Sequence, residues 1–315
     1  MSGQDGAYLA RSLLAKGYEV YGGSRGVKAI PTGNLAALGI DGRVNVETIA
    51  LANFESVIEA IRRIAPDEIY NLAGQSSVAL SFQEPLQTFE GIAVGTTNLL
   101  EALRQVRRPI RLFCAGSSEC FGEVSEPATE TTPFHPESPY AAAKATAFWQ
   151  VAAFRRSYDL YACSAILFNH ESPLRPTRFV TQKIVAGARR IAAGDLEPLS
   201  LGDLSIARDW GWAPEYVEAM WLMLQQSDPA DYVVATGETH RLEDFVAAAF
   251  EEVGLDWRRH VVSDPGLRRP NEVMTSRANP GKAAASLGWR ARHRMRDVVR
   301  DMIRSARPRN GFAAN

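Results

Sequence analysis

The chain has 315 residues, of which 46% are hydrophobic and 23% are charged, and its formal net charge is −1. This composition indicates a soluble globular protein, long enough for one large or two modest domains. The balanced charge excludes a strongly basic protein that binds nucleic acid or a membrane surface. No apolar run approaches the ~20 residues of a membrane-spanning helix and no signal peptide is visible, so we expect a cytoplasmic protein.

Cysteines and histidines give no indication of a metal site. Cys114, Cys120 and Cys163 form no Cys-x-x-Cys pair, and their odd number leaves one unpaired under any disulfide scheme. We therefore expect reduced thiols. The five histidines lack the spacing of metal ligands, so we predict that no metal is bound.

The N-terminal segment predicts a glycine-rich turn followed by a helix. Gly3 and Gly6 precede Leu9, Leu13 and Leu14, which give the next residues an apolar face at helical spacing. In dinucleotide-binding folds a buried strand leads into such a turn, and the helix N-terminus holds the pyrophosphate. Both glycines are therefore candidate cofactor contacts, although a flexible terminus is the alternative. No strand precedes them, so we expect the first strand of the sheet to be missing from this sequence.

Strands and helices then alternate as far as residue 106. The predicted strand 66–71 is followed by Leu72 and Ala73 and then by Gly74. Small residues there permit the close approach of a cofactor, so Leu72 and Ala73 are further candidate contacts. The other predicted strands are 19–23 and 42–46, and the predicted helices are 54–64 and 88–106.

The stretch from 115 to 144 carries the residues with the most specific chemistry. Residues 110–115 are short and apolar, and the following Gly116 predicts a buried strand that ends in a turn. Ser117 and Glu119 would then lie just beyond the carboxyl end of a strand, where open α/β sheets bind their ligands. Both are candidate catalytic residues.

A tyrosine and a lysine follow on a predicted helix. Ser138 is a suitable N-cap and Pro139 suits the first helical position, so Tyr140 and Lys144 lie one turn apart on one face. A neighbouring ammonium favours the phenolate, so we expect Lys144 to bring the pKa of Tyr140 closer to neutral. Such a pair alone arises often by chance. Together with Ser117 and Glu119 it indicates a catalytic centre.

The second half contains further alternating elements and two polar motifs. Phe168-Asn169-His170-Glu171 follows a predicted strand, 160–167, and we favour a turn-shaping over a catalytic role for His170 and Glu171. Arg208 precedes Asp-Trp-Gly and forms the second polar motif with it. The other predicted elements are a helix opening at 178, strands 199–202 and 231–237, helices 214–224 and 242–253, a loop at 268–273 and a closing helix and turn at 278–289.

This alternation predicts an α/β fold: a doubly wound parallel Rossmann sheet with a smaller α/β substrate-binding domain. We expect residues 1–167 to form the dinucleotide-binding domain. Residues 168–315 would form mainly the substrate domain, with 205–237 returning to the sheet.

The motifs together resemble the extended short-chain dehydrogenase/reductase family and, within it, the GDP-mannose 4,6-dehydratases. The resemblance extends over nearly the whole chain and implies NADP as the cofactor. The family usually has a second arginine where Gly26 stands and an aspartate where Ala50 stands. The residues that the resemblance assigns to NADP are Gly3, Gly6, Arg25, Leu72, Ala73, Tyr140 and Lys144.

The resemblance also implies GDP-mannose as the substrate and a dehydration as the reaction. Tyr140 would take the O4 proton during hydride transfer to NADP, Ser117 would hydrogen-bond O4, and Glu119 would move protons at C5 and C6. The product would be GDP-4-keto-6-deoxy-mannose. Ser118 favours GDP-mannose, because dTDP-glucose dehydratases carry an aspartate there. Substrate contacts are implied for Asn169, Lys183, Arg208, Arg269 and Glu272.

Two alternatives remain at this stage. One is another sugar-nucleotide epimerase or reductase of the same family. The other is a catalytically decayed sugar-nucleotide-binding paralogue. The missing first strand, Gly26, Ala50 and Gln182 favour it, and the intact set Ser117, Glu119, Tyr140 and Lys144 opposes it. The resemblance further implies a homodimer or homotetramer.

Overall fold

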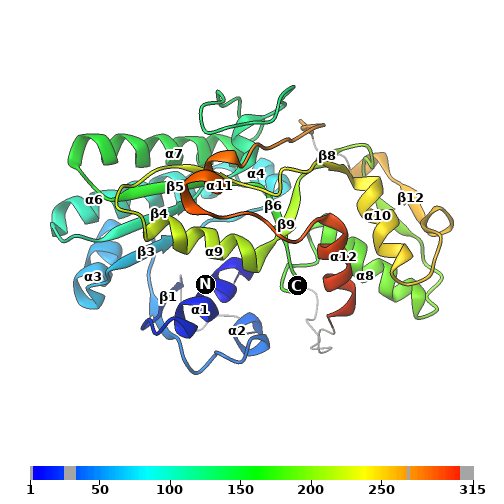
Figure 1. Ribbon diagram of the computed structural model, residues 1–315, viewed down its shortest axis with the longest axis horizontal. Coiled ribbons are helices and arrows are strands. Elements are labelled where there is room, and N and C mark those ends of the chain that lie inside the picture. The colour runs from blue at the N-terminus through cyan, green and yellow to red at the C-terminus, as the bar shows by residue number, and fades with distance from the viewer. Residues whose placement is uncertain (1–2, 25–32, 268–269, 306–315) are drawn as a thin grey trace.

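Four parallel strands form the central sheet of the computed structural model, which describes residues 3–24, 33–267 and 270–305 (Figure 1). Their order is β10–β5–β4–β3 and every neighbouring pair is parallel. All six residues of β5 are buried, as expected for a strand covered on both faces. The strands are β3 (Glu68–Asn71), β4 (Arg111–Ala115), β5 (Ala162–Leu167) and β10 (Tyr232–Val234).

A second pair of parallel strands, β1 (Tyr21–Ser24) and β2 (Asn45–Thr48), lies near the N-terminal helix. Each begins two or three residues further along the chain than the sequence predicted. Within the described ranges β1 forms no ladder with β3, so the two sheets are separate. The absence of a strand ahead of Gly3 stays a prediction.

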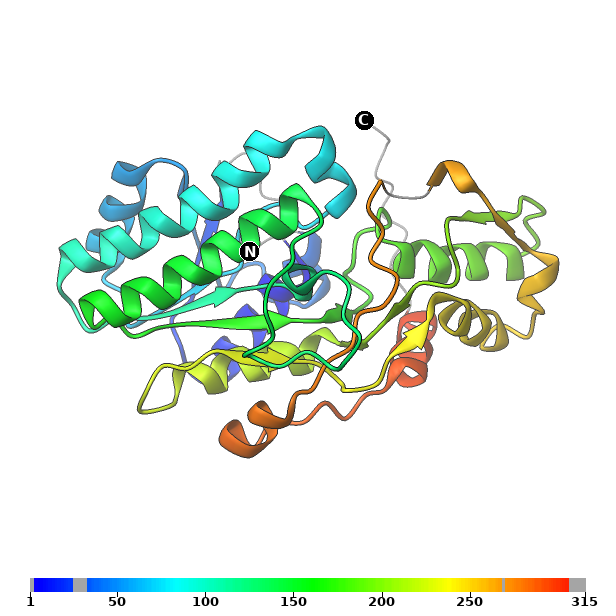
Figure 2. The ribbon, with the colours of Figure 1, turned by 90° about the horizontal axis from the view of Figure 1, so that it is seen from above.

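Helices cover both faces of the central sheet. In Figure 1 α7 (Pro139–Tyr158) lies above the strands and α9 (Ala213–Leu224) lies below them. The helix α6 (Gly95–Val106) runs beside α7 (Figure 2) and also packs on α3 (Phe54–Ile64). On the other face α1 (Gln4–Ala15) packs on α9. The α/β Rossmann-like prediction is thus confirmed.

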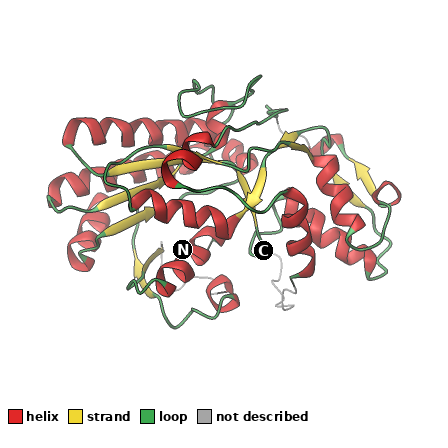
Figure 3. Cartoon of the chain, in the orientation of Figure 1, coloured by secondary structure: helices red, strands yellow, loops and turns green. Residues whose placement is uncertain are grey.

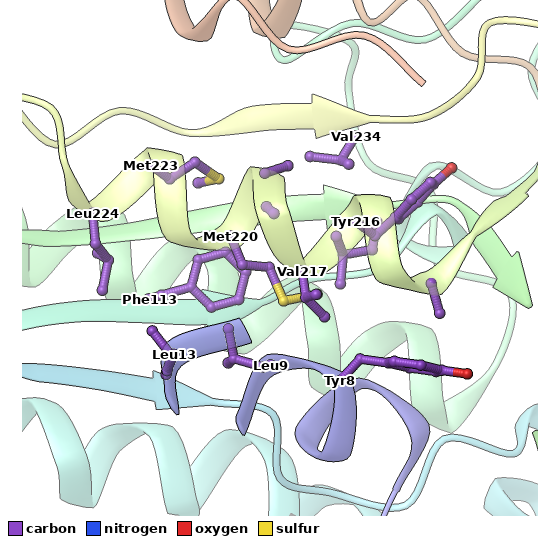
Figure 4. Close-up of a cluster of buried hydrophobic side chains, with 14 of the residues drawn as sticks. Tyr8, Leu9, Leu13, Phe113, Tyr216, Val217, Met220, Met223, Leu224 and Val234 are labelled. Carbon is purple, nitrogen blue, oxygen red and sulfur yellow. The ribbon is translucent and has the colours of Figure 1, made fainter. Parts of the chain in front are cut away.

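The core between α1, α9 and the sheet consists of large apolar side chains (Figure 4). Leu9 and Leu13 of α1 and Met220 of α9 are at most 6% exposed and cluster with Phe113 of β4. Burial of one such side chain contributes ~1.5–3 kcal/mol to stability. This packing fixes the N-terminus of α1 relative to the carboxyl ends of the strands.

A second lobe lies at the opposite end of the molecule from α3 (Figure 3). Its core joins α8 (Val180–Ala192), α10 (Leu242–Glu251) and α12 (Met295–Arg304) around Phe245 and Phe250. The short strands that complete this lobe and its junction are β6 (Asn169–Glu171), β7 (Leu199–Leu201), β8 (Ala207–Arg208), β9 (Trp210–Trp212), β11 (His240–Arg241) and β12 (Val261–Ser263).

Several helix boundaries follow from local sequence. Ser138 caps α7 by accepting a hydrogen bond from the Ala141 amide at 3.1 Å, with Pro139 at the first position, as predicted. The predicted helix 88–106 is interrupted by a π-helical segment, Glu90–Val94, between α5 and α6. The remaining helices are α2 (Gly33–Ala37), α4 (Val78–Gln83), α5 (Pro85–Phe89) and α11 (Gly281–Leu287).

Gly211 is required by close packing where the sheet meets the second lobe. In the parallel pair β6–β9, Gly211 stands opposite His170. A Cβ atom at Gly211 would lie 2.3 Å from Cε2 of the Tyr216 ring, which is fully buried. Only glycine therefore lets this ring pack against β9.

We predict that Gly211→Ala lowers the free energy of unfolding by roughly 1–3 kcal/mol, because the ring of Tyr216 must move in a filled core. Chemical denaturation measures the change. Gly91→Ala is the control, since a Cβ there meets nothing within 4 Å, and it should change stability by no more than ~1 kcal/mol. Equal stabilities of the two variants would contradict the packing argument.

Candidate active site

The end of β4 positions two of the predicted catalytic residues. Gly116 lets the chain turn tightly against β5, because a Cβ there would lie 2.6 Å from the carbonyl oxygen of Ala165. Ser117 then caps a short 3-10 helix, Ser118–Phe121, and its Oγ accepts a hydrogen bond from the Glu119 amide at 3.3 Å. Ser117 is buried and Glu119 is partly exposed. Both lie at the carboxyl edge of the sheet.

The start of α7 brings Tyr140 and Lys144 to the same place. Tyr140 is 7% exposed, and the Ser117 side chain lies close enough to its hydroxyl to favour the phenolate. Lys144 is 8% exposed, and its Nζ donates to the carbonyl oxygen of Ala115, the last residue of β4, at 2.7 Å. Lys144 Nζ lies 5.9 Å from the centroid of the Tyr140 ring. The structure thus gathers Ser117, Tyr140 and Lys144 into one cluster, with Glu119 beside it.

The expected effect of Lys144 on Tyr140 is wrong for this geometry. Burial raises the pKa of Tyr140 above its ordinary value, and the neighbouring Ser117 side chain opposes the shift only in part. Burial also lowers the pKa of Lys144. The ammonium is engaged by Ala115 rather than by the phenol, so desolvation decides the direction for both groups.

A small pocket connects the cluster with the end of β3. Its lining includes Asn71, Ala73, Ala115 and Lys144. Ala73 therefore lines the same pocket as Lys144, and its contact with a cofactor stays a prediction. Leu72 packs instead against the core beneath α1 and α9.

The N-terminus of α1 suits an anionic group. Gly3 is the N-cap, is exposed and supplies no capping side chain, and Gly6 lies in the first turn. Backbone N–H groups at such a terminus favour a phosphate. This uncapped terminus, the small residues after β3 and the buried Lys144 together fit a nicotinamide dinucleotide. Arg25, the predicted 2′-phosphate contact, lies outside the described residues.

The predicted substrate-binding residues are spread over the junction with the second lobe. Asn169 begins β6 and is partly exposed. Lys183, on α8, donates its Nζ to the carbonyl oxygen of Ser200 at 2.7 Å. Arg208 is 4% exposed and pairs with Glu272 at 3.0 Å. Arg269 lies outside the described residues.

Sequence reasoning missed a buried polar network behind Asn169. His170 and Glu171 lie in β6 rather than in a turn. The His170 ring bonds the Phe168 carbonyl oxygen at 2.7 Å and Asp5 Oδ2 at 3.0 Å, and Glu171 accepts a hydrogen bond from Thr181 at 2.7 Å. The sequence offered one signal of this network: two polar residues, Gln4 and Asp5, stand between Gly3 and Gly6 in the turn that opens a helix.

Two absences can be stated for residues 3–24, 33–267 and 270–305. No group of three or more His, Cys, Asp or Glu side chains is arranged to hold a metal ion. No helix there combines the length and apolar character needed to cross a bilayer.

Two solved structures illustrate how closely the fold matches known proteins. The UDP-glucose 4-epimerase of Thermus thermophilus, solved with NAD, superimposes with a TM-score of 0.84 at 29% identity, covering 96% of this chain and 95% of that one. DesIV, a dTDP-glucose 4,6-dehydratase from Streptomyces venezuelae, shares the fold with a TM-score of 0.84 at 23% identity, covering 96% and 94%. The fold is therefore that of the sugar-nucleotide epimerases and dehydratases.

The family is defined more narrowly by sequence. The family model described as GDP-mannose 4,6 dehydratase matches residues 1–302. GDP-mannose 4,6 dehydratase 1 of Arabidopsis thaliana is 45% identical over 313 residues, covering 96% of this chain and 87% of the relative. The chain belongs to the GDP-mannose 4,6-dehydratase family.

The Asp5–His170 pair predicts a pH-dependent stability. Burial alone would lower the pKa of His170, but the Asp5 carboxylate raises it above 6.5; burial would raise the pKa of Asp5, but His170 lowers it below 3.8. The contribution of His170 is complete below pH 6.5 and is lost as pH rises through its folded-state pKa. That of Asp5 is complete above pH 3.8 and is lost as pH falls.

We therefore expect His170→Gln to lower the free energy of unfolding most between pH 3.8 and 6.5. The loss should be about 1.5–3 kcal/mol, the range for hydrogen bonds to charged groups. Denaturant titrations across pH measure it, and Asp5→Asn should lose stability in the same window. A loss that is constant from pH 4 to pH 9 would exclude a charged pair.

Proposed function

We propose that this protein is a GDP-mannose 4,6-dehydratase that uses bound NADP. The observation that carries the proposal is the gathering of Ser117, Tyr140 and Lys144, with Glu119 beside them, at the end of β4. The match to the family over residues 1–302 supports it. NADP rather than NAD rests on Arg25, after β1.

Substrate binding uses residues at the junction of sheet and second lobe. Asn169, Lys183, Arg208 and Arg269 would hold the diphosphate of GDP-mannose, and Glu272 its ribose. Arg208 is held by Glu272 at 3.0 Å in a buried position, so its guanidinium is oriented in advance. A planar guanidinium can contact a diphosphate through two parallel hydrogen bonds.

Tyr140 acts as the base of the first step. The Ser117 side chain lies beside its hydroxyl, so a sugar O4 placed between them would receive a hydrogen bond from Ser117 and give its proton to Tyr140. NADP, when bound, would supply a hydride acceptor for C4 and, once reduced, a hydride donor for C6. Because burial raises the pKa of Tyr140, the fraction of Tyr140 in its basic, phenolate form increases as the pH rises.

Glu119 distinguishes dehydration from epimerisation or simple reduction. Once C4 is a ketone, the C5 proton is acidic, and Glu119 removes it and protonates the departing C6 hydroxyl. The net change is the loss of one water without net oxidation or reduction. The product is GDP-4-keto-6-deoxy-mannose.

The chain organisation supports two further proposals. We assign residues 1–167 with 205–237 to the cofactor domain and the rest of 168–315 to the substrate domain. We also infer a cytoplasmic homodimer or homotetramer without nucleic acid or membrane partners. Phe89 and Trp149 are 43% and 56% exposed on α5 and α7, and Cys114, Cys120 and Cys163 are all unbridged and buried.

The proposal is tested by incubation with GDP-mannose and catalytic NADP⁺, followed by mass spectrometry. We expect a product lighter than the substrate by one water, with no net NADPH. Glu119→Gln should bind NADPH normally and form enzyme-bound NADPH in a single turnover, but release no dehydrated product. Dehydration at the wild-type rate by this variant would remove Glu119 from the mechanism.

Tyr140→Phe should stop the reaction earlier. Loss of the base should lower the rate of hydride transfer ~100- to 10,000-fold. Single-turnover mixtures should therefore show no NADPH absorbance. Fluorescence titration with NADPH provides the binding control. NADPH formation at the wild-type rate would show that another group takes the O4 proton.

A further inference from the structure

The first turn of α1 is joined to β6 by buried side-chain hydrogen bonds. Gln4 Nε2 donates to the carbonyl oxygen of His170 at 2.8 Å, and Ser172 Oγ donates to Gln4 Oε1 at 2.8 Å. Asp5 Oδ2 pairs with His170 Nε2 at 3.0 Å. We call Gln4, Asp5, His170 and Ser172 the α1–β6 bridge.

The bridge is buried. Gln4, His170 and Ser172 are 4%, 7% and 0% exposed. A buried polar group that loses its partner costs ~1–3 kcal/mol. Separation of α1 from β6 would leave several such groups unsatisfied, so the two segments move together.

Each end of the bridge carries a different ligand site. Gly3 and Gly6 flank Gln4 and Asp5 at the uncapped helix terminus proposed to hold the cofactor diphosphate. Asn169, proposed to hold the substrate diphosphate, immediately precedes His170 in β6. Because neighbouring side chains of a strand point to opposite faces, Asn169 faces away from the bridge.

His170 is held firmly from its other side. Its Nδ1 bonds the Phe168 carbonyl oxygen at 2.7 Å, and its ring stacks on Tyr216 with centroids 4.5 Å apart. Tyr216, labelled in Figure 4, fills the space that Gly211 leaves in β9. A shift of β6 is therefore transmitted to α1 rather than absorbed by rotation of the imidazole.

Neighbouring cationic side chains offset the repulsion that Asp5 of the bridge would exert on an anion at α1. A carboxylate in the first turn suits the helix dipole but would repel a diphosphate. His170 is paired with Asp5, and Arg175 and Lys144 interact with the same carboxylate electrostatically. The negative charge of Asp5 is thus compensated within the protein.

We propose that the α1–β6 bridge couples the two nucleotide sites, so that cofactor and sugar nucleotide each strengthen the binding of the other. This inference rests on the proposed function. Gln4 and His170 act as positioning residues: binding at either terminus orders the segment that carries the other site. Linkage requires the effect to be equal in both directions.

The test measures NADPH affinity by fluorescence with and without saturating GDP, and GDP affinity by calorimetry with and without NADPH. For the wild type we expect each nucleotide to tighten the other at least ~5-fold. His170→Phe keeps a ring against Tyr216 but removes both nitrogens, and Gln4→Met keeps the volume but removes two hydrogen bonds. Both variants should reduce the coupling below ~2-fold. The affinity for NADPH alone and the affinity for GDP alone should each change by a smaller factor than the coupling does.

His293→Phe is the matched control. His293 stacks on Trp212 and pairs with Glu215 at 2.9 Å, as His170 does with Tyr216 and Asp5, but it lies outside the bridge. This variant should retain wild-type coupling. If His170→Phe fails to fold, the coupling measured for Gln4→Met decides the outcome.

The outcomes separate the two proposals. Binding of both nucleotides without coupling in the wild type, or unchanged coupling in Gln4→Met, would overturn the bridge and leave the proposed function standing. Failure of the wild type to bind either nucleotide would overturn the proposed function itself.

Discussion

The hydrogen bond from Lys144 to the carbonyl oxygen of Ala115 is the contact on which the site depends. An ammonium that is 8% exposed is costly to bury, and a carbonyl oxygen at 2.7 Å is its compensation. The bond ties α7 to the last residue of β4. Tyr140 lies one turn before Lys144, and Ser117 lies two residues beyond Ala115, so this one contact also sets the position of the phenol relative to the serine.

The second lobe is attached to the sheet by comparable buried polar contacts. Asp209, which follows Arg208, is fully buried and accepts hydrogen bonds from the amides of Thr236 and Gly237 at 3.0 and 2.7 Å. Burial raises the pKa of Asp209 to about 6, although these amides favour its charged form. The carboxylate thereby fixes the backbone next to Arg208 to the end of β10, and so positions Arg208, proposed to bind the substrate diphosphate, relative to the central sheet.

Local patterns were sufficient for much of the fold. The Ser138 cap with Pro139, and the apolar run before Gly116, predicted the start of α7 and the strand β4, because capping and burial act over a few residues. The sequence also predicted that Ser117, Tyr140 and Lys144 lie together, since they follow a strand end and a helix start. It did not predict α12 or the short strands β6 and β9, whose formation depends on partners far away in the chain.

Contacts over long separations were likewise beyond sequence reasoning. Asp5 and His170 are 165 residues apart, so no spacing rule connects them. The direction of the Tyr140 pKa was wrong because a helical repeat places Lys144 nearby but says nothing of burial or of the competing Ala115 carbonyl. Electrostatics depends on the final packing, which a local pattern does not contain.

The docking of α1 has a consequence for the order of folding. Leu9 and Leu13 are buried against α9, and Tyr18 accepts a hydrogen bond from Trp221, 203 residues later. During synthesis the apolar face of α1 stays without its partner until α9 has emerged from the ribosome. Closing so long a loop is slow, since its entropy is lost before the contacts form. The turn at Gly3 and Gly6, proposed to hold the cofactor diphosphate, therefore reaches its final position relative to the sheet only after α9 has been made.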